Sequence, residues 1–329
     1  MNLNGFRDNE FLEEIDEKDY LAQIKDNMKN APFQIRDYQD KAVRAALKYH
    51  KGILLSCTSS GKSLMIYNII RCLRKQEMKH ILLIVPNIML VDQMYDDFES
   101  YGYDNLDNDV ERLGGGHEAT FDKPVLISTW QSLQNKDSEF FEKYNAVFVD
   151  EVHGVKANVM SKLMKWCCNA YYKIGTTGTL PNDKCDLLQI REVVGDVIFE
   201  LKSKELIDKG VLTKIKIANI IAKYPSDFVL KNKGRSYPEE VKMVEEYKDR
   251  NKVLEYILEH TDKKHNVLVL MNHLKHVQLI REWLHEKYPD KKVSVITGAV
   301  SGEERSDIRK GIEEEDGTIL LATYATMTT

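Results

Sequence analysis

The chain has 329 residues, 43% of them hydrophobic and 30% charged, which is typical of a globular protein with room for two domains. Its longest apolar runs have the length of a strand and are too short to span a bilayer, and the first residues lack the basic and apolar segments of a signal peptide. The net charge of −5 excludes a surface that is basic throughout, although it leaves room for a local basic groove. We therefore expect a cytoplasmic protein without a membrane segment.

Residues 1–30 are expected to form an acidic N-terminal extension. Over residues 8–26, apolar side chains are mixed with Asp and Glu in a helix-like pattern. This pattern favours a partly ordered extension, and a helix that binds a specific partner is the alternative.

Beyond the extension, short apolar runs alternate with helical patterns. The apolar runs lie at residues 52–55, 81–85, 125–128, 146–149 and 172–175. The helical patterns lie at residues 63–75, 88–100 and 158–168. Such alternation predicts a parallel sheet with helices on both faces, in which ligands bind at the carboxyl ends of the strands.

A second alternating block predicts a second domain. Its strands are expected at residues 267–270, 293–296 and 318–322. Between the two blocks lie a strand-like run at 215–221, a polar turn at 231–235 and one long helix at 238–260. We place the two domains at residues 31–205 and 206–329, each an α/β unit with a mostly parallel sheet.

Residues 56–63 have the pattern of a phosphate-binding turn between a strand and a helix. Small residues there let backbone N–H groups and a helix N-terminus face a phosphate. Lys62 supplies a positive charge for the β- and γ-phosphates, and the Ser63 hydroxyl is suited to hold Mg²⁺. Ser56 stands where the common pattern has its first glycine. The residues that we expect to face ATP and its Mg²⁺ are Thr58, Ser59, Ser60, Gly61, Lys62 and Ser63.

The apolar run at 146–149 ends in two acids, Asp150 and Glu151. A carboxylate at a strand end beside a phosphate-binding turn can anchor Mg²⁺, which is the role predicted for Asp150. Glu151 is suited to polarise the attacking water. Two acids at a strand end are common surface chemistry when they stand alone. Their position in the same alternating fold as the turn favours a catalytic role.

The phosphate-binding turn and the sequence at 150–153 together resemble the nucleotide motifs of superfamily 2 helicases. The resemblance implies two RecA-like domains, the second of them incomplete, and ATP and Mg²⁺ as cofactors. Residues 35–39 resemble the adenine motif of that family, which implies that Gln39, with Arg36 nearby, contacts the base. An ordinary helix start with a polar face is the alternative for this segment.

Residues 176–180 resemble the family motif that links the Mg²⁺ site to the nucleic acid. This match implies that Thr177 and Thr179 act as hydroxyl partners in that link and that His153 joins it. A histidine that only packs or caps a helix is the alternative for His153.

The resemblance also implies contacts with a nucleic-acid backbone. Small and hydroxyl residues suit such contacts, because a backbone N–H needs unobstructed approach to a phosphate and a hydroxyl can donate to it. In the first domain the matching residues are Pro86, Asn87, Gln93, Gly114, Gly115, Thr129 and Gln131. In the second domain they are Gly298 and Arg305. For the glycines at 114–116 a flexible loop without a ligand is the alternative.

A finer resemblance, to a phage-encoded branch of the family, rests on the substituted turn and on residues 233–237 and 250–251. That branch implies an ATP-driven translocase on double-stranded DNA, which unwinds branched DNA, D-loops and R-loops and migrates junctions. Two departures stand out. A short extension replaces the expected N-terminal accessory domain, and the sequence ends inside the fifth helicase motif, before the arginines of the sixth. Because such arginines raise the rate by about 10³–10⁵, we expect this chain alone to hydrolyse ATP poorly.

Several functional alternatives stay open. The motor subunit of a restriction enzyme and an RNA-directed helicase would carry the same motifs. A non-catalytic binding fragment would keep the fold without the motor, although the intact Lys62, Asp150 and Glu151 speak against decay of the site. A small-molecule kinase would have a single domain, which the second alternating block and Gln39 disfavour.

Overall fold

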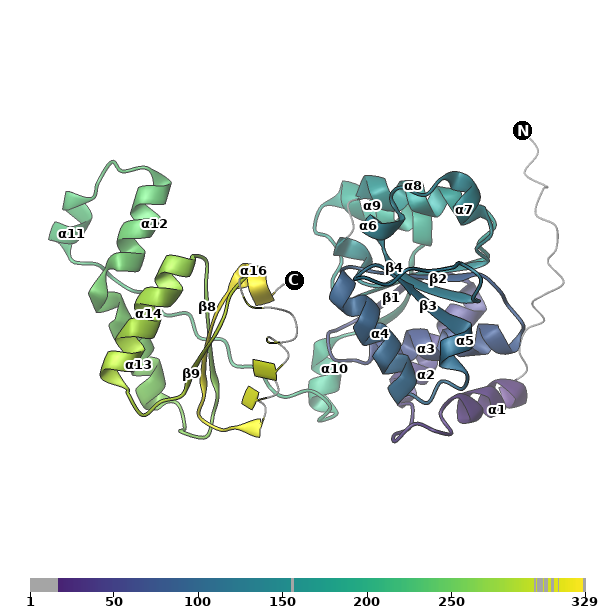
Figure 1. The fold of residues 1–329 in the computed structure, drawn as a ribbon, viewed down its shortest axis with the longest axis horizontal. Helices are drawn as coiled ribbons and strands as arrows, with labels where there is room; N and C mark the ends of the chain where they lie inside the picture. Colours follow the sequence, from purple (N-terminus) through teal and green to yellow (C-terminus); the bar gives the residue numbers. More distant parts are fainter. Residues whose placement is uncertain are drawn as a thin grey trace. The chain divides into compact units, whose positions relative to one another are not determined.

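The computed structural model describes residues 17–154, 157–298, 300, 304, 307–308, 311–312 and 314–327. The chain divides into two compact units, Met1–Ile215 and Lys216–Thr329 (Figure 1). The division predicted between residues 205 and 206 falls within the helix α10 (Ser203–Asp208). Leu206 of that helix is fully buried in the core of the first unit.

The first unit is built on a seven-stranded parallel sheet with the strand order β3-β4-β2-β5-β6-β1-β7. The strands are β1 (Lys51–Ser56), β2 (Ile81–Val85), β3 (Val110–Leu113), β4 (Val125–Thr129), β5 (Ala146–Val149), β6 (Tyr172–Thr177) and β7 (Val197–Leu201). The sheet confirms the predicted α/β architecture. The strands β3 and β7 were not predicted. Both are edge strands in which a glutamate, Glu111 or Glu200, interrupts the apolar pattern.

Helices cover both faces of this sheet (Figure 1). One core contains side chains from α1 (Glu17–Asn27), α2 (Asp37–Tyr49), α3 (Lys62–Lys75), α4 (Ile88–Ser100), α5 (Leu106–Asp109) and α10. The other contains side chains from α6 (Trp130–Leu133), α7 (Ser138–Glu142), the 3₁₀ turn η1 (Val152–Gly154), α8 (Ala157–Trp166) and α9 (Lys184–Val194). Successive strand residues alternate between the cores, so Leu83 enters the first while Leu82 and Ile84 enter the second.

The helix α1 is part of the first core, whereas the sequence pattern assigned its residues to an extension. Its Tyr20 and Ile24, and Met28 just beyond it, are buried in that core. Burial of each such side chain contributes about 1.5–3 kcal/mol, which is enough to fix a short helix. Residues 1–16 of the predicted extension lie outside the described residues.

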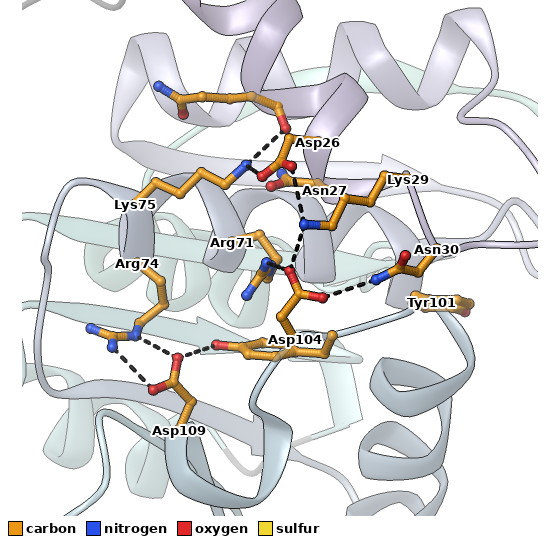
Figure 2. A network of polar contacts seen from close by, with 12 residues as sticks. Asp26, Asn27, Lys29, Asn30, Arg71, Arg74, Lys75, Tyr101, Asp104 and Asp109 are labelled. Atoms are coloured by element: carbon orange, nitrogen blue, oxygen red, sulfur yellow. Dashed lines mark hydrogen bonds and ion pairs between the residues drawn. The ribbon is translucent and has the colours of Figure 1, made fainter.

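A polar network around Asp104 also holds the chain just after α1 (Figure 2). Asp104 accepts from Asn30 Nδ2 at 2.9 Å and pairs with Lys29 at 3.1 Å and Arg71 at 3.4 Å. Asp26 pairs with Lys75 at 2.6 Å. Most of these side chains are half exposed, so each pair contributes only about 0–1 kcal/mol. Apolar burial therefore dominates the docking of α1.

The second unit has a three-stranded parallel sheet with the order β8-β10-β9. Its strands are β8 (Val267–Met271), β9 (Val293–Ile296) and β10 (Ile319–Thr323), which confirms the predicted strands. Its helices include α11 (Ser226–Lys231), α12 (Tyr237–Glu246), α13 (Asn251–His260), α14 (Leu274–Lys287) and α16 (Tyr324–Met327). The helix α14 packs on the sheet through Val277, Ile280 and Leu284.

Two predictions for the segment between the sheets were wrong. Residues 215–221 form no strand, because no neighbouring strand pairs with them, and Ile215 and Ile217 are 80% and 87% exposed. The long helix at 238–260 is broken at Tyr247, whose ψ of 105° ends α12 before the 3₁₀ turn η2 (Lys248–Arg250). The ring of Tyr247 packs on Phe228 with centroids 4.3 Å apart, a contact that favours the break.

In the described part of the chain, every helix is too short or too polar to cross a bilayer.

Gly102 tests the docking of residues 28–31 against the first core. Its φ is +80°, and a Cβ there would lie 2.5 Å from Asn30 Cβ and 3.0 Å from the Asn30 carbonyl carbon. We expect Gly102→Ala to lower the free energy of unfolding by about 2–4 kcal/mol. This loss is the sum of the cost of a left-handed backbone at alanine and the cost of moving the Asn30 backbone away from the added Cβ. Urea unfolding measures the change.

Gly210→Ala is the matched control for that substitution. Gly210 has a similar φ of +69°, with nothing within 4 Å of the added Cβ, so only the conformational cost of about 1–2 kcal/mol applies. Equal losses in the two variants would contradict the close approach to Asn30.

Candidate functional site

The strand order of the first unit gathers the predicted site residues into two groups at the carboxyl edge of the sheet. The neighbours β5, β6 and β1 end in the acids, the threonine motif and the phosphate-binding turn. The neighbours β3, β4 and β2 end in the glycine turn, Thr129 and the Pro86-Asn87 pair. Segments far apart in the sequence thus meet at one edge, as expected for a parallel sheet.

The phosphate-binding turn leads from β1 into α3. Gly61 caps the helix in the left-handed region, with φ of +82°, and Ser59 has φ of +63°. The Ser60 N–H donates to the Cys57 carbonyl at 3.2 Å, which closes the turn. Such a turn presents backbone N–H groups and the positive end of α3 to an anion.

The serine at position 56 has a structural role of its own. Ser56 Oγ donates to Ser60 Oγ at 2.7 Å, and both side chains are fully buried beneath the turn. The hydrogen bond between the two serines thus fixes the turn at position 56, where the common pattern has a glycine with a flexible backbone. The sequence pattern gave no sign of this pair.

Gln39 lies directly against the phosphate-binding turn. Its Nε2 donates to the Ser60 carbonyl at 2.9 Å, and its Oε1 accepts from the Arg36 N–H at 2.9 Å. A Cβ at Gly61 would lie 2.3 Å from Gln39 Nε2, and the φ of +82° is rare for other residues, so a side chain there would strain the backbone and displace the Gln39 carboxamide. Gln39 is buried, whereas the Arg36 side chain is exposed and donates to Tyr38 Oη at 3.0 Å.

Lys62 and Glu151 form an ion pair across the site. Lys62 Nζ lies 2.8 Å from Glu151 Oε1, and the side chains are only 12% and 29% exposed. Glu151 has φ of +46°, which is rare for a residue with a side chain and costs about 1–3 kcal/mol. Strain of this kind at the end of a buried strand is typical of functional positions.

Asp150 is buried beside this pair and accepts a hydrogen bond from Thr176 Oγ1 at 2.6 Å. Burial raises the pKa of Asp150, while the bond from Thr176 and the positive charge of Lys62 oppose that rise. A bound cation would relieve the cost of burying this charge. The oxygen atoms of Asp150 and Ser63 are the ligand type that Mg²⁺ prefers.

The described residues contain no cluster of three or more His, Cys, Asp or Glu side chains that could hold a metal ion alone. Mg²⁺ that binds together with a nucleotide usually takes one or two protein groups and the phosphates as ligands. The buried carboxylate of Asp150 and the hydroxyl of Ser63 at the start of α3 fit Mg²⁺ bound in this way.

The Thr177 hydroxyl and the His153 imidazole lie beside Glu151. His153 Nδ1 lies 2.6 Å from Thr177 Oγ1, which lies 3.3 Å from Glu151 Oε2 and 2.8 Å from the Thr179 carbonyl. Thr179 takes part through its backbone, and its side chain is exposed. A Cβ at Gly178 would lie 3.6 Å from the Ser56 carbonyl and the Thr58 N–H, so this turn lies against the phosphate-binding turn.

The predicted nucleic-acid residues of the first unit cluster around the glycine turn. Gly114 and Gly115 have φ of +111° and +66°, and added Cβ atoms would lie 2.7 Å from Ser132 Oγ and 2.6 Å from Ile88 Cγ2. The Asn87 carboxamide caps α4 by accepting from the Leu90 N–H at 3.0 Å. A side chain at either glycine would therefore strain the backbone and force Ser132 or Ile88 to move.

Thr129 and Gln131 lie on either side of the start of α6. The Thr129 hydroxyl accepts from the Ser132 N–H at 3.2 Å and is buried as a helix cap. Gln131 and, on α4, Gln93 are exposed, while Pro86 is partly buried. The side chains of Gln93 and Gln131 are therefore accessible to a ligand, whereas Thr129 and Asn87 are engaged within the protein.

Asp92 was not predicted and fixes the glycine turn. Its Oδ1 lies 2.8 Å from both Arg112 Nη1 and His117 Nε2, on the two sides of the turn. The Arg112 guanidinium also stacks over the Tyr95 ring at 4.1 Å. In the sequence, only the charged residues on either side of the glycines indicated that such a contact with Asp92 could form.

Gly298 belongs to the second unit, where it lies exposed in a turn after β9. Arg305 lies outside the described residues.

Part of the chain matches a known family. Residues 32–182 match the family described as type III restriction enzyme, res subunit. Together with the two parallel sheets and the relatives below, this match confirms the resemblance to superfamily 2 helicases and the RecA-like α/β fold.

Among individual proteins, the chain is 29% identical over 325 residues to the ATP-dependent DNA helicase UvsW of Enterobacteria phage T4, covering 96% of this chain and 64% of the relative. The crystal structure of T4 UvsW matches with a TM-score of 0.52 and 27% identity, covering 96% of this chain and 63% of the other. The DNA 3'-5' translocase XPB2 of Sulfurisphaera tokodaii is 29% identical over 189 residues, 57% of this chain and 40% of the relative. The chain thus spans less than two thirds of these relatives.

The raised pKa of Asp150 makes a prediction about stability and pH. Because the folded protein holds this proton more tightly than the unfolded one, the contribution of Asp150 to stability falls as the pH rises from the unfolded pKa through the raised folded value. We expect Asp150→Asn to raise the free energy of unfolding at pH 7 without metal and to flatten its pH dependence.

Urea unfolding between pH 4 and 8 in EDTA checks this prediction. Asp137→Asn is the control, because Asp137 also accepts a hydrogen bond, from the Phe140 N–H at 3.0 Å, but is exposed. We expect the control to change stability by less than about 0.5 kcal/mol. A loss of stability in Asp150→Asn at pH 7 would contradict the buried charge.

Proposed function

We propose that the chain is the motor portion of an ATP-dependent DNA helicase or translocase, with ATP and Mg²⁺ bound by the first unit. The observation that carries the proposal is the Lys62–Glu151 ion pair, set beside the buried Asp150 at the mouth of a phosphate-binding turn. The names of two relatives, an ATP-dependent DNA helicase and a DNA 3'-5' translocase, support this reading.

The ion pair suggests how the site responds to nucleotide. Without nucleotide, Lys62 neutralises Glu151. When phosphates occupy the turn, Lys62 exchanges Glu151 for the β- and γ-phosphates, and the released carboxylate takes the proton of a water molecule. That water attacks the γ-phosphorus, the bond to the ADP oxygen breaks, and ADP and phosphate leave. Mg²⁺, held by Asp150 and Ser63, would neutralise charge that develops on the phosphates.

Glu151 and Thr177 connect this chemistry to the rest of the unit. The contacts from Glu151 through Thr177 to His153 give the catalytic carboxylate a fixed orientation. We assign Thr177 and His153 the coupling role, in which a change at the γ-phosphate reaches the neighbouring turn.

We further propose that the glycine turn and the exposed side chains of Gln93 and Gln131 contact a DNA backbone, while Asn87 and Thr129 hold this cluster in place as helix caps. Backbone recognition is independent of sequence and weakens steeply with salt, because counterions are released on binding. Branched DNA, D-loops and R-loops are the proposed substrates, and junction migration the proposed reaction. The match to a restriction-enzyme subunit family favours one second candidate, the motor subunit of a restriction enzyme.

Lys62→Ala tests the nucleotide site. We expect the affinity of the full chain for Mg²⁺ and a non-hydrolysable ATP analogue to fall at least tenfold, since a charge-assisted hydrogen bond contributes about 1.5–3 kcal/mol. Glu151→Gln should bind the analogue at least as tightly as the unsubstituted chain, because Lys62 loses its competing partner. Calorimetry measures both. Equal affinities of the unsubstituted chain and Lys62→Ala would remove the assignment.

Nucleic-acid specificity calls for a separate test. We expect forked DNA and duplex DNA to raise the rate of ATP hydrolysis, and Glu151→Gln to abolish that rise. Stimulation by RNA alone would overturn the DNA proposal, and stimulation by linear duplex with none by forks would favour the restriction-motor candidate.

A further inference from the structure

The Ser63 hydroxyl, assigned above to Mg²⁺, contacts a residue that no helicase motif of this chain includes. Ser63 Oγ lies 2.8 Å from Tyr101 Oη. Ser63 is the second residue of α3, and Tyr101 directly follows α4. Two helices of the same core therefore meet at the hydroxyl group that would ligate the cation.

Tyr101 is fixed by packing on two sides of its ring. The ring meets the Tyr67 ring edge-on, with centroids 5.3 Å apart, and the Phe33 ring at 5.7 Å. Its carbonyl accepts from Tyr67 Oη at 3.2 Å. The next residue, Gly102, lies against Asn30, which binds Asp104 (Figure 2). The phenol has little freedom to turn away from Ser63.

Asp97 lies four residues before Tyr101, in the last turn of α4, and the Tyr101 N–H donates to its carbonyl at 2.9 Å. This backbone hydrogen bond fixes the position of Tyr101 at the end of the helix. In the pair of hydroxyls either oxygen can be the donor, so Ser63 can donate its hydrogen to Tyr101 Oη.

The direction of the hydrogen bond between Ser63 and Tyr101 matters for a metal ligand. A hydroxyl that coordinates a divalent cation uses an oxygen lone pair, so its hydrogen must point to another acceptor. If the hydrogen points toward the cation, the ligand bond is lost. An acceptor fixed by packing removes the cost of orienting the hydroxyl when the cation arrives.

We propose that Tyr101 is a positioning residue that turns the Ser63 hydroxyl so that its lone pair faces the Mg²⁺ of a bound nucleotide. This inference rests on the proposed nucleotide site. It adds to that site a residue from α4, whose first residues lie at the glycine turn through Ile88.

Tyr101→Phe tests the proposal, because it removes the hydroxyl and keeps the ring contacts. Calorimetry of the full chain with ADP is done with excess Mg²⁺ and again in EDTA, and the ratio of the two affinities is compared between variants. We expect the affinity in EDTA to stay within twofold and the gain from Mg²⁺ to fall about three- to tenfold, the effect of one hydrogen bond.

Two further variants separate positioning from packing. Tyr103 belongs to the same aromatic cluster, but its hydroxyl donates to Asp109 at 3.0 Å. Tyr103→Phe should therefore leave the gain in affinity from Mg²⁺ unchanged. In a double-mutant cycle, Tyr101→Phe should cost little once Ser63→Ala has removed the ligand.

The proposal is overturned if Tyr101→Phe keeps the full gain from Mg²⁺, or if it lowers affinity equally with Mg²⁺ and in EDTA, as a packing defect would. A failure of the nucleotide site itself has a different signature. In that case the unsubstituted chain binds no ADP under either condition.

Discussion

The ion pair between Lys62 and Glu151 is the interaction on which the site depends. Lys62 Nζ and Glu151 Oε1 lie 2.8 Å apart, so each group neutralises the charge of the other at a place that water reaches poorly. Lys62 can bind an incoming phosphate only when its ion pair with Glu151 is broken. Binding of an anion at the turn and release of a base are therefore one event in our account.

The strand order of the sheet places the other predicted site residues near this ion pair. The adjacent ends of β5, β6 and β1 bring Asp150, Thr177 and the phosphate-binding turn together. The ends of β3, β4 and β2 form the neighbouring cluster of the glycine turn, which Asp92 fixes through Arg112 and His117. The helix α4 begins at the second cluster and is followed by Tyr101 at Ser63 in the first. One rigid helix thus spans both proposed ligand sites.

Much of the fold follows from sequence because central parallel strands are buried on both faces and appear as unbroken apolar runs. The strands β3 and β7 could not be predicted in this way, because they are edge strands in which Glu111 and Glu200 are tolerated. The run at 215–221 has a strand-like pattern but no partner, and Tyr247 breaks a helix through ring contacts that local pattern does not contain. The turn and the acids were readable as local motifs. The contacts of Ser56 with Ser60, Asp92 with Arg112, and Ser63 with Tyr101 arise only when distant segments pack.

A crystal structure of the full chain with ADP and Mg²⁺ tests the central claim most directly. We expect the β-phosphate to lie in the turn at residues 56–63, with Lys62 Nζ bound to it and no longer to Glu151, and with the metal held by Ser63 and Asp150. A nucleotide bound elsewhere, or a filled turn in which the Lys62–Glu151 pair stays intact, would contradict the account.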